Sequence, residues 1–367
     1  MDEGTINSLA DLEFKDVSGF SNSTLIVTNK SAKKESEKPS KLVVRFFESA
    51  GADLAAESAT FRLMGEKGLG PKEYFVDEKM RVEECIAGRA LEMVELRNPH
   101  LSKAIIEALC DMNYDQDLIA ASRRIKGPDS IFLRDLTAEN GWLSLLKQMR
   151  QASNFSTVED PDVKGIQQFF DGILQDSDSF AADFKACLPK NCREGIDIVF
   201  SHNDFQENNT MLCGNDYTKV VLIDFEYSQM NYRGADLAAY FNEVMITYNH
   251  AGQIPFKIYY DWMLTSAELN TVMEIYLGRY HTKFYKGDDT LEQFLAHEKP
   301  ILLEQIRRCV LLTHVMWAFG SLLLLPSFET KPVEFMGYHL YAWARLEMLQ
   351  EAKKHFLREH FPSLAIA

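Results

Sequence analysis

Short apolar runs separated by polar clusters dominate the first part of the chain, which is the pattern of strands and hairpins. Residues 20–28 (FSNSTLIVT) and 41–49 (KLVVRFFES) are rich in β-branched and aromatic residues and predict two strands. The segment between them, 29–40 (NKSAKKESEKPS), is charged and poor in apolar residues. It predicts a loop that joins the two strands as a hairpin.

The next stretch combines a helix with two more strands. Residues 53–68 follow a helical apolar period, with Asp53 as a candidate N-cap and Gly68 as a candidate end. Residues 73–86 (EYFVDEKMRVEECI) predict two short strands around a turn at 77–79. Together these elements predict a β-rich N-terminal unit.

Beyond this unit the apolar spacing becomes helical, most clearly in 166–188 and 267–285. Residues 196–226 are the exception. There a short apolar strand leads into the polar loop SHNDFQENN, and a small hairpin follows with its turn at 214–216.

The chain of 367 residues is long enough for two lobes, and this change of pattern divides it. We predict an α+β protein of two lobes: a β-rich lobe at 1–86 and a mainly helical lobe at 87–367.

Composition and charge narrow the function. A formal net charge of −15 disfavours a nucleic-acid binder, because phosphate backbones require a basic surface. The same charge suits a cationic small molecule. The cysteines form no CxxC pair and no zinc spacing, so we expect reduced thiols in a cytoplasmic protein. The six cysteines are Cys85, Cys110, Cys187, Cys192, Cys213 and Cys309.

Two segments bear on membranes. The acidic N-terminus has no basic region followed by an apolar one, so it does not read as a signal peptide. Residues 310–325 (VLLTHVMWAFGSLLLL) are apolar, but the run is short for a membrane span and contains His314 and Gly320. We expect a buried helix there and no stable membrane insertion.

The strongest chemical signal is an ordered set of carboxylate and amide residues. Asp204 precedes Asn209 by five positions, and Asp224 follows a hydrophobic strand. Protein kinases show the same order in their HRDxxxxN and DFG motifs. Phosphoryl transfer requires a carboxylate that accepts the hydroxyl proton, which Asp204 fits. Asn209 and Asp224 supply the hard oxygen ligands that Mg²⁺ prefers.

The alternative is that these residues are ordinary turn formers, since Asp and Asn favour turns. That alternative does not explain two apolar strands that each end in such residues at kinase spacing. Near them, Glu226 is expected to assist in holding the metal and Gln206 to shape the loop. For His202 we expect a structural hydrogen bond rather than acid–base chemistry.

The segments SHNDFQENN and IDFEYSQMNYRGADLAAYFNE resemble the corresponding motifs of choline and ethanolamine kinases. This family belongs to a superfamily that includes the aminoglycoside phosphotransferases. The resemblance implies a bilobal protein-kinase-like fold, ATP and Mg²⁺ as cofactors, and a small amino alcohol as substrate. It also implies a homodimer and a cytoplasmic role in phospholipid synthesis.

The resemblance extends to the nucleotide site in the N-terminal lobe. Ser21, Asn22 and Ser23 match the phosphate loop of the family, while no GxxxxGK[ST] motif is present. Arg45 takes the place of the kinase lysine and is implied to grip phosphate oxygens, with Glu57 as its helix partner. The implied adenine contacts come from the backbone of a linker of four residues: Glu83, Glu84, Cys85 and Ile86.

A quaternary ammonium group is held best by aromatic faces with a carboxylate nearby. By resemblance, the acceptor pocket consists of Tyr227, Glu243, Tyr248, Trp317 and Tyr341. The family usually carries two tryptophans three positions apart, whereas this chain has Gly320 at the second position. One aromatic wall is therefore absent, unless Phe319 or a neighbouring helix fills the space.

Three functions remain open from the residues. Phosphorylation of choline to phosphocholine is favoured, because DFEYS followed by NYRG resembles the choline kinase version. Ethanolamine kinase activity is the alternative, since a primary ammonium depends less on aromatic walls. The third function is a catalytically inactive kinase-like protein that binds ligands, although Asp204, Asn209 and Asp224 are all present. An aminoglycoside phosphotransferase would not require the NYRG continuation.

Overall fold

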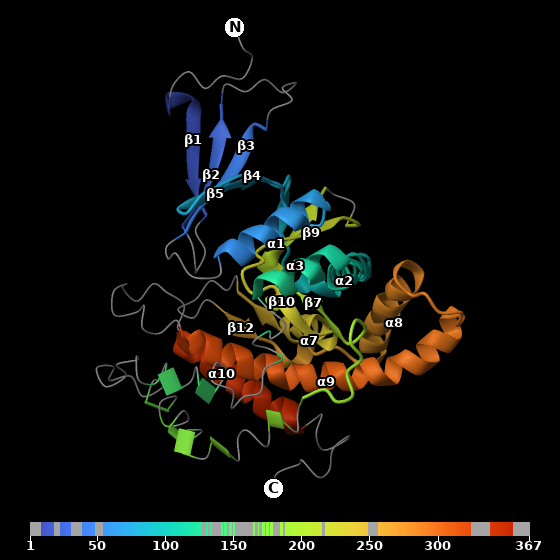
Figure 1. The fold of residues 1–367 in the computed structure, drawn as a ribbon. Coiled ribbons are helices and arrows are strands. Elements are labelled where there is room, and N and C mark those ends of the chain that lie inside the picture. The colour runs from blue at the N-terminus through green and yellow to red at the C-terminus, as the bar shows by residue number, and fades with distance from the viewer. Residues whose placement is uncertain are drawn as a thin grey trace.

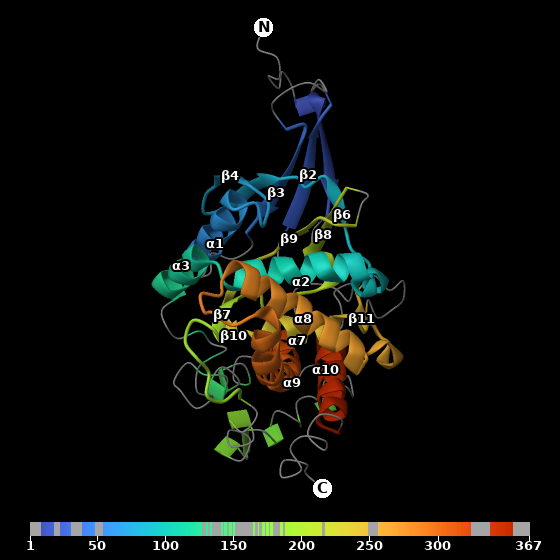
Figure 2. The same ribbon diagram turned by 90° about the vertical axis from the view of Figure 1, so that its right-hand side faces the viewer.

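The computed structural model describes residues 9–17, 23–30, 39–47, 54–126, 188–214, 217–248, 256–323 and 338–354, with scattered positions between 130 and 185. Two views show a sheet of strands at the end of the molecule near the N-terminus and helices at the other end (Figures 1 and 2). Helices α1 (Leu54–Glu66) and α3 (Gln116–Lys126) pack against each other where the two parts meet.

The N-terminal sheet has five antiparallel strands in the order β1-β2-β3-β5-β4. The strands are β1 (Leu12–Asp16), β2 (Ser23–Asn29), β3 (Lys41–Phe46), β4 (Glu73–Val76) and β5 (Met80–Glu84). Four of them, and the hairpin pairing of β2 with β3, confirm the prediction. β1 was not predicted, because LEFKD offers only two apolar side chains and is fixed by its pairing with β2. The candidate cap Asp53 lies outside the described residues.

Helix α1 ends as predicted beside Gly68, whose φ of 68° is a left-handed conformation that suits glycine. The N–H groups of Leu69 and Gly70 both donate to the carbonyl of Met64 and close the last turn.

The chain changes sheet between Glu84 and Gly88, the interval that contains the predicted lobe boundary. Strand β6 (Gly88–Ala90) pairs with β8 (Thr210–Cys213), which forms the predicted hairpin with β9 (Val220–Leu222). Beside this sheet, β7 (Ile198–Ser201) pairs antiparallel with β10 (Gln229–Tyr232).

Most of the rest of the described C-terminal part is helical. The helices are α2 (Pro99–Asn113), α3, α7 (Gly234–Glu243), α8 (Ser266–Lys283), α9 (Leu291–Leu323) and α10 (Tyr338–Ala352). The short elements are η1 (Leu9–Asp11), η2 (Met93–Arg97), η4 (Glu207–Asn209), β11 (Ile246–Thr247), β12 (Lys257–Ile258) and η5 (Tyr260–Trp262). Helix α8 confirms the pattern at 267–285, whereas most of 166–188 lies outside the described residues.

Helix α9 includes most of the apolar run that was considered for a membrane span. It packs against α7, α8 and α10, and its buried apolar residues belong to the main hydrophobic core. Among the described residues, no helix is long and apolar enough to cross a membrane. The cysteines that the structure describes are free thiols, and Cys187 is not among them.

The N-terminus of α7 is pressed against the middle of α9. A Cβ added to Gly234 would lie 2.9 Å from both the carbonyl carbon of Gln305 and the amide nitrogen of Ile306. Only a residue without a side chain permits this approach, which explains the glycine of the NYRG segment.

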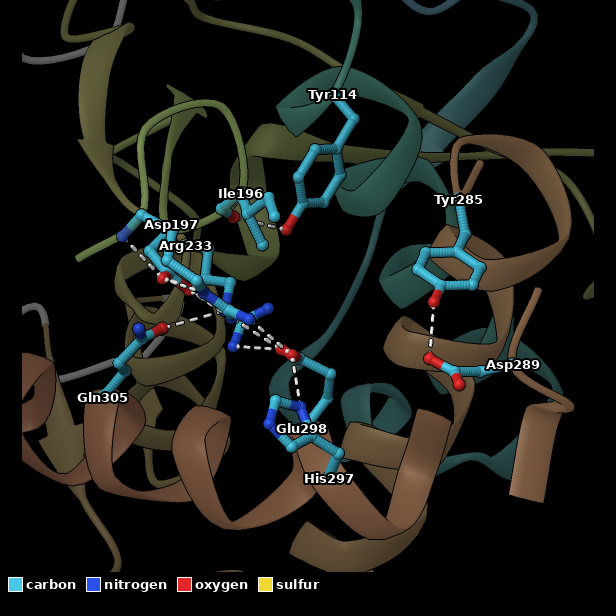
Figure 3. Close-up of polar contacts among 10 residues, drawn as sticks. Tyr114, Ile196, Asp197, Arg233, Tyr285, Asp289, His297, Glu298 and Gln305 are labelled. Carbon is cyan, nitrogen blue, oxygen red and sulfur yellow. Dashed lines mark hydrogen bonds and ion pairs between the residues drawn. The ribbon is translucent and has the colours of Figure 1, made fainter. Parts of the chain in front are cut away.

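Arg233, the residue before this glycine, is fully buried in a cluster of ionic groups (Figure 3). Its Nε lies 3.0 Å from Asp197 Oδ1 and its Nη2 lies 2.8 Å from Glu298 Oε2 on α9. Arg193 reaches the same two carboxylates, at 2.8 Å and 2.6 Å. Two guanidinium groups thus face two carboxylates, and the cluster joins α7 to α9 and to the segment before β7.

The close contact at Gly234 predicts a strong effect of a single methyl group. We expect Gly234→Ala to lower the free energy of unfolding by about 1–3 kcal/mol, because backbone atoms of α9 must move. Gly278→Ala in α8 is the matched control, since an added Cβ there meets no described atom within 4 Å. Urea unfolding measures both. Equal stability of the two variants would contradict the contact.

The ionic cluster predicts a defined loss of stability in acid. Burial acts to raise the pKa of Asp197 and Glu298, but Arg193 and Arg233 outweigh it and lower each pKa to about 2. Both carboxylates therefore stabilise the fold fully above their unfolded pKa values near 4, and this contribution is lost as the pH falls toward 2.

We expect Glu298→Gln to be less stable at pH 7 and to lose less free energy of unfolding between pH 6 and pH 3 than the unchanged protein. Glu107→Gln, at a glutamate that pairs across 4.0 Å with the exposed Lys103, is the control. A Glu298→Gln curve parallel to that of the unchanged protein would show that the cluster does not titrate in this way.

Candidate active site

The loop that follows β7 is hydrogen-bonded to Asp236 of α7. The carboxylate of Asp236 accepts hydrogen bonds from the backbone N–H groups of His202 and Asn203, each at 3.0 Å. It also accepts one from Asn113 Nδ2 of α2 at 2.8 Å. Helix α7 packs closely on α9, so the hydrogen bonds of Asp236 attach the loop to the helical core.

Asn203 adopts a left-handed backbone conformation, with a φ of 66°, which asparagine tolerates better than most residues. Its Nδ2 donates to the carbonyl of Tyr227 at 2.9 Å, and its Oδ1 accepts from Asn231 Nδ2 at 2.8 Å. The loop is thus fastened to the segment that follows Asp224.

His202 has the structural role that we expected. Its Nδ1 accepts from the N–H of Asp204 at 3.3 Å, so its Nε2 donates to the carbonyl of Ile223 at 3.0 Å. Burial lowers the pKa of the ring, which keeps it neutral in this arrangement. The imidazole therefore joins the loop to the strand that delivers Asp224.

Asp204 and Asn209 are in direct contact. Asn209 Nδ2 donates to the Asp204 carbonyl oxygen and to its carboxylate Oδ2, both at 2.9 Å. Burial, with the nearby charges of Asp224, Glu226 and Glu243, raises the pKa of Asp204. The backbone carbonyl of Gln206 accepts from the N–H of Asn209 at 3.1 Å. The fixed amide thus orients one carboxylate oxygen.

Asp224 lies opposite this pair and also has a φ of 66°, which bends the chain sharply after β9. Arg45 Nη1 of β3 donates to Asp224 Oδ1 at 3.3 Å, so the two lobes touch at this carboxylate. Asp224 and Glu226 offer carboxylate oxygens, and Asn209 retains its carbonyl oxygen because its Nδ2 is bound to Asp204. Oxygen donors of this kind suit Mg²⁺, which takes hard oxygen ligands and shares them with phosphates, although the described residues contain no group of three or more acidic, His or Cys side chains placed to hold a metal.

One predicted pairing is wrong. Glu57 was expected as the helix partner that orients Arg45, but its ion pair is with Arg81, whose Nη2 lies 3.0 Å from Glu57 Oε1. The charge of Glu57 still acts on Arg45 and helps to raise its pKa. Arg45 pairs instead with Glu83, at 3.5 Å, and with Asp224. The reason is that Arg81 lies directly opposite Arg45 in the β3–β5 ladder and takes the helix carboxylate.

The other predicted nucleotide contacts lie around the sheet. Ser23 begins β2, while Ser21 and Asn22 lie outside the described residues. Glu83 and Glu84 are the last residues of β5, and the N–H of Glu84 already donates to Lys72 at 2.8 Å. Cys85 and Ile86 follow the strand and begin the passage to the second lobe.

The predicted acceptor residues form two groups that meet at Trp317. Tyr227 contacts Trp317 edge-on, with ring centroids 5.6 Å apart. Tyr248 donates to Glu243 Oε2 at 2.8 Å and lies 2.7 Å from the hydroxyl of Tyr341. Trp317 packs against the small cluster that contains Tyr341. The structure thus brings all five residues to one region between α7, α9 and α10.

Arg345, on α10, changes the electrostatics of this pocket. Its Nη2 forms an ion pair with Glu243, and its Nε donates to the hydroxyl of Tyr341 at 2.8 Å. Burial raises the pKa of Glu243 even though Arg345 opposes this shift. Glu243 therefore already forms an ion pair with the buried guanidinium of Arg345, which offsets its negative charge.

At the position of the absent second tryptophan, the described residues leave space beside Gly320. A Cβ built on Gly320 meets no described atom within 4 Å. The side chain of Phe319, which was considered as a replacement wall, lies outside the described residues.

Three residues that contact the candidate site were not predicted from the sequence. Asp236 lies two positions after the glycine of NYRG, and Arg345 lies one helical turn after Tyr341. Glu207 follows Gln206, and its Oε1 accepts from Tyr248 N–H at 3.0 Å and Thr247 Oγ1 at 3.1 Å. The spacing after the glycine is the only sequence signal for Asp236, whereas the other two depend on contacts between distant segments.

Comparison with known proteins agrees with this geometry. A family model described as choline/ethanolamine kinase matches residues 15–350. Human choline/ethanolamine kinase is 27% identical over 334 residues, which cover 89% of this chain and 76% of that protein. Human ethanolamine kinase 1 is 24% identical over 296 residues, covering 78% of this chain and 56% of that protein.

The structure of choline kinase from Cryptosporidium parvum superimposes with a TM-score of 0.67 at 20% identity, covering 98% of this chain and 94% of that one. This likeness confirms the predicted bilobal, protein-kinase-like fold. Because the family model spans most of the sequence, the chain belongs to the choline/ethanolamine kinase family.

Proposed function

We propose that this protein transfers the γ-phosphate of ATP to the hydroxyl group of choline, with ethanolamine as a second acceptor. The observation that carries the proposal is the arrangement of Asp204, Asn209 and Asp224 together with Arg45. Asp204 is oriented by Asn209, and Asp224 contacts a guanidinium from the other lobe. This set provides a proton acceptor, metal ligands and a cation for phosphate at one place.

The nucleotide is proposed to lie between the lobes, with Arg45 on its phosphates and Asn209, Asp224 and Glu226 holding Mg²⁺. When bound, Mg²⁺ neutralises charge on the phosphates. Ser21, Asn22 and Ser23 are proposed to contact the phosphates, and residues 83–86 the adenine. Burial of Arg45 among Asp224, Glu83 and Glu57 leaves it a permanent cation, because these carboxylates more than offset the effect of burial and raise its pKa.

Asp204 is proposed to align the acceptor hydroxyl and to take its proton. The hydroxyl oxygen forms a bond to the γ-phosphorus while the bond to the bridging oxygen of ADP breaks, so ADP leaves with the electron pair. Most of the rate enhancement then comes from positioning and from charge stabilisation by fixed groups. The hydrogen bonds of Asp236 to the loop support this positioning.

The acceptor headgroup is proposed to lie against Tyr227 and Trp317. Aromatic faces attract a quaternary ammonium through their electron-rich rings. Glu243 contributes less than an unpaired carboxylate, because Arg345 shares its charge. This balance supports choline over ethanolamine, since a primary ammonium depends more on carboxylates and hydrogen bonds. The homodimer and the cytoplasmic location stay predictions.

The proposed roles of the two aspartates predict loss of turnover without loss of fold. We expect Asp204→Asn and Asp224→Asn to lower kcat at least about a hundredfold. ATP consumption with Mg²⁺ and either choline or ethanolamine measures this, and thermal unfolding checks the fold. Glu292→Gln, on the exposed start of α9, is the control. Near-normal turnover of either aspartate variant would refute the assignment.

The aromatic wall predicts a difference between the two acceptors. We expect Trp317→Leu to raise KM for choline about tenfold, and KM for ethanolamine less, because only the quaternary headgroup depends mainly on ring faces. Trp343→Leu is the matched control, since Trp343 is on α10 and 42% exposed. Equal effects on both acceptors would show that Trp317 does not select the headgroup.

A further inference from the structure

Two arginines face each other in the N-terminal sheet. Arg45 of β3 and Arg81 of β5 are direct partners in the antiparallel ladder, so their side chains leave the same face of the sheet. Arg81 is 1% exposed. Like charges opposite each other destabilise a sheet unless carboxylates lie between or beside them.

Two glutamates compensate the two positive charges, and Arg81 has closer contacts with them than Arg45 has. Glu83 lies two positions after Arg81 on the same face; its Oε1 accepts from Arg81 Nε at 2.9 Å and lies 3.5 Å from Arg45 Nε. Glu57 of α1 lies 3.0 Å from Arg81 Nη2. Arg81 therefore binds both carboxylates, whereas Arg45 has an ion pair with only one of them.

Arg81 also contacts the segment around Asp224 through aromatic rings. Its guanidinium carbon lies 3.9 Å from the ring centroid of Phe61 on α1. Phe61 in turn packs edge-on against Phe225, with centroids 6.2 Å apart. Phe225 is the neighbour of Asp224, to which Arg45 donates. Arg81 is thus linked to the segment Asp224–Phe225 in two ways. One link consists of ion pairs through Glu83 and Arg45, and the other of ring contacts through Phe61.

We propose that Arg81 is a positioning residue for the nucleotide site: it holds Glu83 in place and occupies Glu57, so that Arg45 is positioned by its own sheet rather than by helix α1. The proposal rests on the proposed role of Arg45 in binding the phosphates of ATP. Its consequence is that the carboxylate on the strand governs nucleotide affinity, and the carboxylate on the helix governs it much less.

Matched carboxamide variants separate the two carboxylates. ADP with Mg²⁺ is the probe, and its dissociation constant is measured by calorimetric titration of the full chain. We expect Glu83→Gln to weaken ADP binding about tenfold, because Arg45 loses its partner on the sheet. Glu57→Gln is expected to weaken it by about threefold or less, because the ion pair of the helix carboxylate is with Arg81 and its effect on Arg45 is only at longer range.

Arg81→Met tests the arginine itself. We expect about tenfold weaker ADP binding and a similar rise in KM for ATP, with KM for choline unchanged. A purely structural role would lower the melting temperature without this selective effect on the nucleotide. Glu13→Gln is the control, since Glu13 lies on β1 of the same sheet but pairs with the exposed Lys30, away from the network.

The outcomes are distinct. A larger effect of Glu57→Gln than of Glu83→Gln on ADP binding would overturn the proposal, and so would equal effects. If Arg81→Met does not fold, the comparison of the two glutamine variants still decides. If the unchanged protein binds ADP but phosphorylates neither choline nor ethanolamine, the proposed function fails while this comparison remains valid.

Discussion

The close packing of helix α7 on helix α9 is the constraint on which the candidate active site depends. Gly234 allows the two backbones to approach, and the buried Arg233 ties the helix start to Asp197 and Glu298. Asp236 then stands beneath the loop after β7 and accepts two of its N–H groups. A loop held in this way can keep Asn203 in a left-handed conformation, because surrounding bonds over-determine it.

The electrostatic design of the site follows from what surrounds Asp204. Asp204, Asp224 and Glu226 bring several negative charges close together, and Arg45 of the other lobe pairs with Asp224. Carboxylates gathered in this way repel one another unless cations are bound. The arrangement therefore favours the binding of a metal with its nucleotide and of a positively charged acceptor, which agrees with the family to which the chain belongs.

The candidate acceptor pocket combines aromatic side chains with a carboxylate that is already paired with an arginine. The rings of Tyr227 and Trp317 contact each other edge-on, while no atom of the described residues fills the space beside Gly320. Meanwhile Arg345 binds both Glu243 and Tyr341, so these side chains form a hydrogen-bonded group on the polar side of the pocket. A ligand in this pocket would therefore meet aromatic rings and an arginine–glutamate ion pair rather than an unpaired carboxylate.

The sequence by itself determined the lobes, most of the strands and the kinase-like order of Asp204, Asn209 and Asp224. These features depend on local periodicity and on short spacings, which a linear chain records directly. Strand β1 escaped because it is defined by its pairing with β2 rather than by its own composition. Only the tertiary structure decided that Glu57 pairs with Arg81 and that Glu243 pairs with Arg345. Ion pairs of this kind join segments far apart in the chain, and a charged side chain carries no local signal of which opposite charge it will meet.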